Sequence, residues 1–532
     1  MLTIGNFSYH SFCVSTKKKK KKKKNYLLTA ISRTGKENCC IKKMVDCCPQ
    51  PLQSQGPESV RKKRVLFENP AYLDQPRPRA SLTLLTLLGV SYTACISGGY
   101  GLEESVSAGG PLLTIVFLCI IPILWGVPVS LCVAELSCAI RSNAGPIMWV
   151  NVAFQPWFCF CTVICTAVLN FVDNSLYPTV LADYMAKLWD LNFAEKSALK
   201  VSFLCICTLV NISGVHVVGV LSVGMMAVTL MPFLLLFVLQ IPEGFDWQRI
   251  STVPERVNWS VFLPVVAWNF SGFEGAGNVI EEVENPKKTF ICALFLLIFC
   301  ALATYIPPVI VGASAEAIKN TPFEEWDTGF LIRVGEAVGG YRLALFVTIG
   351  GAVSTFGLMT TQLTTTSRSL AGMGTLNAFP LISNWLSRYN SRSGTPVQAI
   401  CTNAVITCIL SICFTFTTLV ELDQIFYSLR LIAILLSFLR LRQTQPDLER
   451  PYCVPEGRVG ALICGIVPII FSAVLIFTSI AGSTGLLFTT IGVVGGTIMM
   501  SILWVHFLRP NGFEGQLVEY EDSDLCSYGS AT

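Results

Sequence analysis

Charged residues are scarce in this chain of 532 residues, where aspartate, glutamate, lysine and arginine together make up 14%; about 25% is usual for a soluble protein. Histidine is scarcer still, since only His10, His216 and His506 occur and they lie far apart in the sequence. They offer no metal-ligand spacing and no nucleophile–base pair. The sequence therefore predicts neither an enzyme nor a metal site, and it implies no cofactor.

Long polar stretches are also missing after about residue 80. Hydrophobic residues make up 52% of the chain, and apolar runs of about 20 residues, the length of a helix that spans a bilayer, follow one another. We therefore expect an all-α polytopic membrane protein with about twelve transmembrane helices in residues 81–510, surrounded by lipid. Most of the 22 cysteines lie within these runs, where a thiol acts as a small apolar side chain.

The two ends of the chain read as tails. Residues 1–80 are polar, proline-containing and basic, with a run of lysines from Lys17 to Lys24, a composition typical of disorder. Such a run can bind anionic lipid or nucleic acid, but nothing else in the sequence indicates a nucleic-acid partner. Basic loop residues such as Arg141 and acidic ones such as Glu324 fall on opposite sides of the expected spans, so the positive-inside rule predicts cytoplasmic termini, including residues 511–532.

Two apolar segments are interrupted by small residues. The first break is Gly98-Gly99-Tyr100-Gly101, and the second runs from Trp268 to Gly277. Free backbone groups at membrane depth are tolerated where they line a cavity. Two such interrupted segments in matching halves of a chain indicate a transporter binding site, so we expect a secondary transporter with broken helices 1 and 6.

The acid that follows the first break suggests the charge of the ligand. A helix that restarts near Leu102 directs its positive end at the break, and that end favours anions. Glu103 would compensate this dipole and repel a substrate carboxylate, which favours a ligand that carries only amines. The alternative is that Glu103 and Glu104 are ordinary acids of a helix N-terminus that faces the outer vestibule.

Two further groups of polar residues are candidates for the pathway. Glu274, within the second break, can pair with an ammonium group or carry a proton, or it can be a structural acid held by backbone amides. In the third expected span, about Pro146 to Tyr184, Asp173, Asn174 and Tyr177 can line the pathway, or they can be the polar end of a tilted helix.

Aromatic side chains near these acids would provide walls for a flexible cation. Ser354 and Thr355 form a hydroxyl pair at a position where some transporters of this architecture hold sodium, although such pairs are common. Arg430 lies within an apolar run and needs a partner. The candidate binding residues are Gly98, Gly99, Tyr100, Gly101, Glu103, Asp173, Asn174, Tyr177, Trp268, Asn269, Phe273, Glu274 and Tyr427.

Several segments carry a resemblance to a known family: GGYGLEESVSAGGPLL, VAELSCAIRSNAGPIMWVNVAF, VDNSLYP, WNFSGFEGAGNVIEEVENPKKTF and RPYCVP. With them the chain resembles the amino acid–polyamine–organocation (APC) superfamily, and within it the polyamine-uptake transporters of plants and trypanosomatids. The resemblance implies a LeuT-like fold of two five-helix inverted repeats plus two helices, and uptake of putrescine- or spermidine-like cations driven by protons. Carried over by position, it implies pathway roles for Glu103, Asp173, Asn174, Tyr177, Trp268, Asn269 and Glu274.

The function expected from the sequence is therefore import of polyamines across the plasma membrane by alternating access. One alternative keeps the fold and makes the chain an amino acid permease, perhaps for cationic amino acids. A second alternative is a nutrient sensor that binds the same ligand and transports little. No feature of the sequence indicates an oligomeric state.

Overall fold

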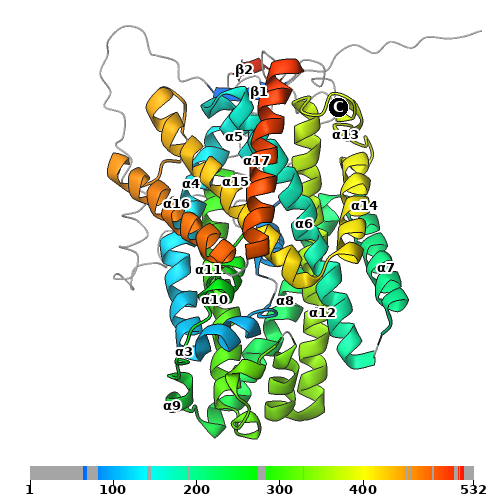
Figure 1. The fold of residues 1–532 in the computed structure, drawn as a ribbon, viewed down its shortest axis with the longest axis vertical. Helices are drawn as coiled ribbons and strands as arrows, with labels where there is room; N and C mark the ends of the chain where they lie inside the picture. Colours follow the sequence, from blue (N-terminus) through cyan, green and yellow to red (C-terminus); the bar gives the residue numbers. More distant parts are fainter. Residues whose placement is uncertain are drawn as a thin grey trace, which may run out of the picture. The chain divides into compact units, whose positions relative to one another are not determined.

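The computed structural model describes residues 64–68, 82–96, 98–140, 145–189, 191–272, 283, 286–327, 329–450, 452–455, 457–481, 484–508, 513 and 516–520. Within these residues the chain is a bundle of helices with one small sheet (Figure 1). Eight helical stretches are long and apolar enough to cross a membrane: Glu103–Ala139, Pro156–Asp183, Val220–Glu243, Ile291–Ser314, Phe330–Thr375, Leu422–Thr444, Gly457–Ala481 and Thr490–Phe507. The prediction of a mostly helical polytopic membrane protein is confirmed.

The other four of the twelve expected spans are also helical, but they are shorter or carry more charged residues than these eight. Helix α7 (Phe193–Ile212) has Glu195, Lys196 and Lys200 in its sequence, and α14 (Val397–Cys413) is shorter than a full span. The remaining two, α2 (Leu84–Cys95) and α10 (Trp259–Trp268), are short because they are the first halves of the two interrupted segments.

The first break requires glycine. Helix α2 ends at Cys95, and α3 (Glu103–Ile121) begins after a turn in which Gly98 and Gly101 have φ angles of 117° and 89°. Only glycine adopts such angles without strain. The second break begins in the same way, because Gly272 follows the end of α10 with a φ of 93°. Both predicted breaks are present, and the remainder of the second, with Phe273 and Glu274, lies outside the described residues.

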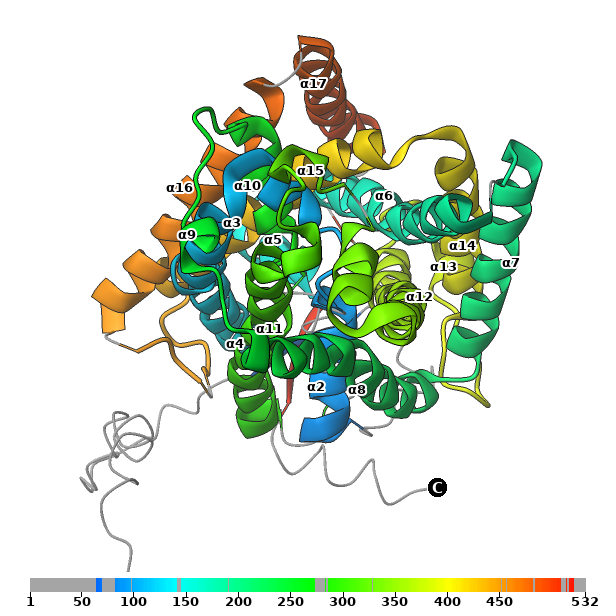
Figure 2. The ribbon, with the colours of Figure 1, turned by 90° about the horizontal axis from the view of Figure 1, so that it is seen from below.

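The half-helix α2 packs against long helices from both halves of the chain, whereas α10 packs mainly against α3. Helix α8 (Val215–Gln240) packs against α2 and against α12 (Phe330–Thr375), while α6 (Pro156–Trp189) packs against α12 and α15 (Phe416–Thr444). Figure 2 shows α7, α16 (Gly457–Ala481) and α17 (Thr484–Phe507) at the periphery of the bundle. Large apolar side chains such as Phe477 and Phe488 are exposed there, as expected for helices that contact lipid.

Two expected spans differ in detail from the structure. The third is not one helix from Pro146, because α5 (Pro146–Ala153) ends where Phe154 is extended and α6 starts anew at Pro156. A proline disfavours the helical conformation of the residue before it. The second span follows Gly110, where α3 leaves helical geometry, as expected, but it passes through a π-helical turn, Pro122–Gly126, before α4 (Val127–Ala139).

A small sheet joins segments of the two tails. Strand β1 (Arg64–Glu68) pairs antiparallel with β2 (Gln516–Tyr520). Just before β2, the ring of Phe513 lies 5.0 Å from that of Trp504, which stacks on Phe160 at 4.1 Å. Figure 1 shows the sheet at the end of the bundle that holds α13 (Ser383–Leu386), opposite α9 (Trp247–Ile250). Both tails therefore contribute a described segment to the same end of the bundle.

Candidate substrate-binding cavity

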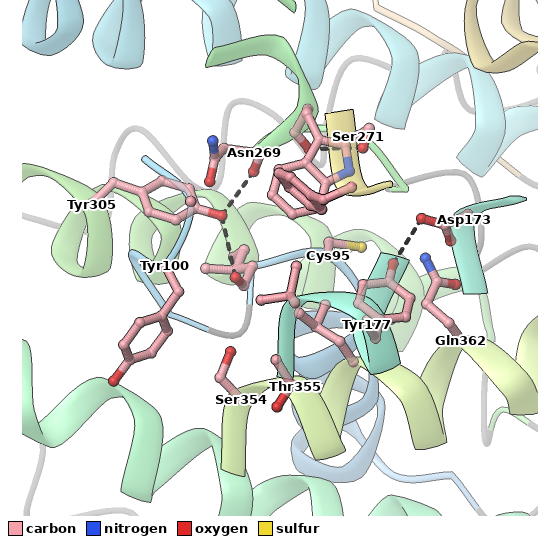
Figure 3. Close-up of a pocket in the computed structure, with 17 residues that line it drawn as sticks. Cys95, Tyr100, Asp173, Tyr177, Asn269, Ser271, Tyr305, Ser354, Thr355 and Gln362 are labelled. Atoms are coloured by element: carbon pink, nitrogen blue, oxygen red, sulfur yellow. Dashed lines mark hydrogen bonds between the residues drawn. The ribbon is translucent and has the colours of Figure 1, made fainter. Parts of the chain in front are cut away.

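A cavity lies where the two broken helices face α6 and α12 (Figure 3). It holds about 640 Å³ of space not filled by atoms, including its open mouth. Its wall is built from the ends of α2 and α10 and from facing sides of α6, α11 (Pro286–Ser314), α12 and α15. Six of the residues that the sequence nominates lie on this wall: Tyr100, Gly101, Asp173, Tyr177, Trp268 and Asn269.

Asp173 gives the cavity its charge. It is the only charged side chain among the described residues that line the cavity. Residues four apart lie on one face of a helix, and the hydroxyl of Tyr177 donates a hydrogen bond of 2.8 Å to Asp173 Oδ1 (Figure 3). The side chain of Gln362, which the sequence analysis did not single out, lies on the wall beside them.

The ends of α2 and α10 are linked by a tyrosine. The last carbonyls of a helix have no partner within it, and the Tyr305 hydroxyl donates to the carbonyl of Asn269 at 2.8 Å and lies 3.4 Å from that of Ile96. Tyr305 comes from α11 and was not predicted, although a phenol within an apolar run is a usable signal. Since Ile96 and Asn269 both line the cavity, the negative ends of two helix dipoles lie at its wall, and such ends favour cations.

Glu103 lies beside the cavity and is not among the residues that line it. Its side chain is buried, with 1% exposed. One carboxylate oxygen accepts the amide of Gly101 at 2.7 Å, and the other accepts the amide of Gly329, just before α12, at 3.2 Å. The amide of Gly101, a residue on the cavity wall, is therefore already bound by a carboxylate of the chain itself.

Other nominated residues lie close to the cavity wall or away from it. A Cβ atom on Gly98 would lie only 2.7 Å from the ring of Tyr100, and one on Gly99 would lie 3.3 Å from Pro308 in α11, so both glycines are packed in the turn. The Asn174 amide donates to Thr366 Oγ1 at 2.9 Å and to Asn403 Oδ1 at 3.1 Å. Neighbouring residues of a helix point about 100° apart. Asn174 therefore faces α12 and α14 and joins α6 to both helices, while Asp173 faces the cavity.

Tyr427 supports the second break from α15. Its hydroxyl accepts the amide of Gly272 at 3.0 Å, and its ring faces the guanidinium carbon of Arg430 at 5.6 Å. An aromatic face is therefore one partner of Arg430. Ser354 and Thr355 do line the cavity, and the Thr355 hydroxyl donates to the carbonyl of Gly351 at 3.1 Å within its own helix.

Residues 82–505 match the family described as "Amino acid permease". The chain belongs to this family. It is 28% identical over 445 residues to a "probable polyamine transporter" of Arabidopsis thaliana, a match that covers 82% of this chain and 91% of that protein. It is 26% identical over 434 residues to "Polyamine transporter PUT1" of Oryza sativa subsp. japonica, covering 81% of this chain and 80% of that one.

The fold of the permease is also found in a solved structure. A crystal structure of MhsT in complex with L-phenylalanine matches with a TM-score of 0.55 and 13% identity, over 76% of this chain and all of that one. The predicted APC fold, two inverted repeats with broken helices, is confirmed. The permease is a multi-pass membrane transporter.

A buried ion cluster lies elsewhere in the permease, where α4, the last turn of α15 and the segment that follows α15 meet. The Glu135 carboxylate, with 2% of its side chain exposed, accepts a hydrogen bond from Arg442 Nε at 2.8 Å and lies 3.3 Å from Arg450 Nε. It also accepts the amide of Val454 at 2.7 Å. The cluster joins two sequence segments that carried the family resemblance, VAELSC and RPYCVP, and was not predicted as a unit.

Proposed function

We propose that this permease is a secondary active transporter that imports polyamines, putrescine- or spermidine-like cations, across the plasma membrane by alternating access. Protons drive uptake, and both termini lie in the cytoplasm. The observation that carries the proposal is the cavity wall, where Asp173 is the only charged side chain among the described residues. The names of the plant relatives support the same substrate class.

The apolar part of the wall suits an alkyl chain with ammonium ends. Tyr177, Trp268 and Phe416 lie on this wall. Aromatic faces attract cations and also bury methylene groups. One ammonium group would pair with Asp173, and the carbonyl ends of α2 and α10 would contribute negative partial charge. An amino acid with an uncharged side chain has only one ammonium group, so it has no second one that could interact with these features.

Glu103 supports the exclusion of carboxylates. In transporters with broken helices, the positive end of a half-helix can hold the carboxylate of a substrate. Here Glu103 Oε2 accepts the Gly101 amide at 2.7 Å, so that position at the start of α3 is filled by the protein. A substrate carboxylate that approached it would meet a like charge.

Contacts on both sides of the half-helices must change during alternating access. Leu82, which precedes α2, forms a parallel backbone bridge with Val283, which precedes α11. On the α3 side, the hydrogen bond between Glu103 and Gly329 ties the restarted helix to the loop before α12. Loss of one of these two contacts would open the cavity to one side of the membrane, and loss of the other would open it to the opposite side.

Uptake of radiolabelled putrescine by transport-deficient cells tests the proposal. We expect saturable uptake that unlabelled spermidine blocks and leucine does not. Replacing sodium with choline should leave uptake intact, and a proton uncoupler should abolish it. Competition by leucine or arginine in place of spermidine would identify an amino acid permease, and binding without uptake would identify a sensor.

Replacing Glu103 with alanine should relax substrate selection. We expect leucine to begin to inhibit putrescine uptake, because the Gly101 amide and the positive end of α3 become available to a carboxylate. Two hydrogen bonds to a buried carboxylate are lost as well, so the variant should be less stable by about 1–3 kcal/mol. The matched control is Glu104→Ala in the same helical turn, for which leucine should remain without effect. Unchanged exclusion of leucine in Glu103→Ala would reject this role.

A further inference from the structure

Besides Glu103, another buried acid lies outside the cavity wall. Asp423 belongs to α15, and only 2% of it is exposed. An ionisable side chain buried within a membrane span is costly and marks a functional site by default. The Nε2 atom of its neighbour Gln424 donates a hydrogen bond of 3.2 Å to Asp423 Oδ2.

The face of α15 that carries Asp423 looks towards the cavity and the second break. Phe416, Leu419, Asp423 and Tyr427 follow one another at intervals of three or four residues, which places them on one side of the helix. Phe416 lines the cavity, and Tyr427 accepts the amide of Gly272 at the break. Asp423 lies between these two levels.

Asp423 lies on the side of α15 that packs against the part of α6 that carries Asp173. Leu419 packs in one apolar cluster with Val172, which precedes Asp173 in α6, and with Leu176, which lies one turn further along. The Tyr177 hydroxyl donates to Asp173 Oδ1 at 2.8 Å, and Asp423 lies one turn along α15 from Leu419. Asp423 therefore lies close to the turn of α6 that carries Asp173 and Tyr177.

We propose that Asp423 is a further negative charge of the binding site, which acts from the α15 side of the cavity and selects ligands by the number of their ammonium groups. The inference rests on the proposed function and names a residue that sets its specificity. Asp423 does not touch the ligand. Its negative charge attracts the ammonium groups through the protein between them, which screens the charge less than water does. For two opposite charges about 10 Å apart at an effective dielectric constant of about 20, Coulomb's law corresponds to a change in affinity of roughly 15-fold.

The charge number of the ligand separates this role from a purely structural one. Loss of the Asp423 charge should weaken the binding of putrescine, which has two ammonium groups. It should weaken the binding of spermidine, which has three, by a further factor of about five. A structural defect would lower both affinities equally or lower only the amount of folded protein. The ratio of the two inhibition constants, measured on one preparation, does not depend on the folded fraction.

The experiment measures inhibition of labelled putrescine uptake by both amines in the full-length chain, for wild type, Asp423→Asn, Asp423→Glu and Asp183→Asn. We expect the ratio of the inhibition constants to change about fivefold in Asp423→Asn and to return towards wild type in Asp423→Glu. Asp183→Asn is the matched control, because that acid of α6 is 47% exposed and 3.7 Å from Lys196, and its charge is screened by water.

Two results would overturn the inference, and they have different meanings. An unchanged ratio in Asp423→Asn, with a wild type that takes up putrescine, would overturn only the role of Asp423. A wild type that neither takes up putrescine nor is inhibited by either amine would overturn the proposed function and the inference together.

Discussion

Asp173→Asn should lower the affinity for putrescine about 30-fold or more. The amide keeps the shape of the side chain and can still accept a hydrogen bond from Tyr177, but it removes the only charge on the described cavity wall. Truncating one partner of a desolvated, hydrogen-bonded charge pair costs about 2–5 kcal/mol, and each 1.4 kcal/mol is a factor of ten. The measurement is the concentration dependence of uptake in the wild type and the variant at matched surface expression.

A matched control separates the loss of the Asp173 charge from the loss of any other acidic side chain of α6. Asp183 lies on the same helix, ten residues further along, with an exposed side chain that pairs with Lys196. Because exposed ion pairs contribute little, Asp183→Asn should change the affinity by no more than about twofold. Equal effects of the two substitutions, or undiminished affinity in Asp173→Asn, would contradict the assignment of Asp173 as the ammonium partner.

Glu135→Gln should destabilise the protein by about 3–5 kcal/mol. Glu135 is buried and contacts Arg442, Arg450 and the amide of Val454. Removing its charge leaves two arginines near a buried site without their carboxylate, and breaking a buried pair from one side is strongly destabilising. The measurement is the thermal unfolding midpoint of purified protein in detergent, which we expect to fall by on the order of 5 °C or more.

The control for the ion cluster is an exposed pair. Glu316 has 86% of its side chain exposed and lies 3.3 Å from Lys319, so Glu316→Gln should leave the unfolding midpoint almost unchanged. A double-mutant cycle with Arg442→Gln should show that the effects of the Glu135 and Arg442 substitutions are not additive. Additive effects, or a midpoint of Glu135→Gln equal to that of the control, would show that the ion cluster does not stabilise the folded protein.

Features of the fold set by single residues were predictable from the sequence. The breaks could be predicted because backbone angles such as those of Gly98 and Gly101 require glycine, and the sequence shows the glycines directly. Asp173 and Tyr177 could be predicted as a pair because their spacing of four places them on one helical face. The break in the third span was missed, although Pro156 signals it, because the apolar run continues through it.

Features that depend on packing between distant segments were not predictable in the same way. Glu135 and Arg442 are 307 positions apart, and no local pattern indicates that they meet. The rotation of α6 decides that Asp173 faces the cavity while Asn174 faces Thr366, and a sequence gives this rotation only once neighbouring helices are placed. For the same reason Tyr305, Gln362 and Asp423 remained ordinary polar residues of apolar runs until the helices around them were known.

The most direct test of the central claim is binding of putrescine to the purified protein by isothermal titration calorimetry, with wild type and Asp173→Asn measured side by side and leucine as a second ligand. The proposed site predicts that the wild type binds putrescine and not leucine, and that Asp173→Asn binds putrescine about 30-fold more weakly or not measurably while it remains folded. Binding of leucine by the wild type, or putrescine binding of equal strength in the variant, would contradict it.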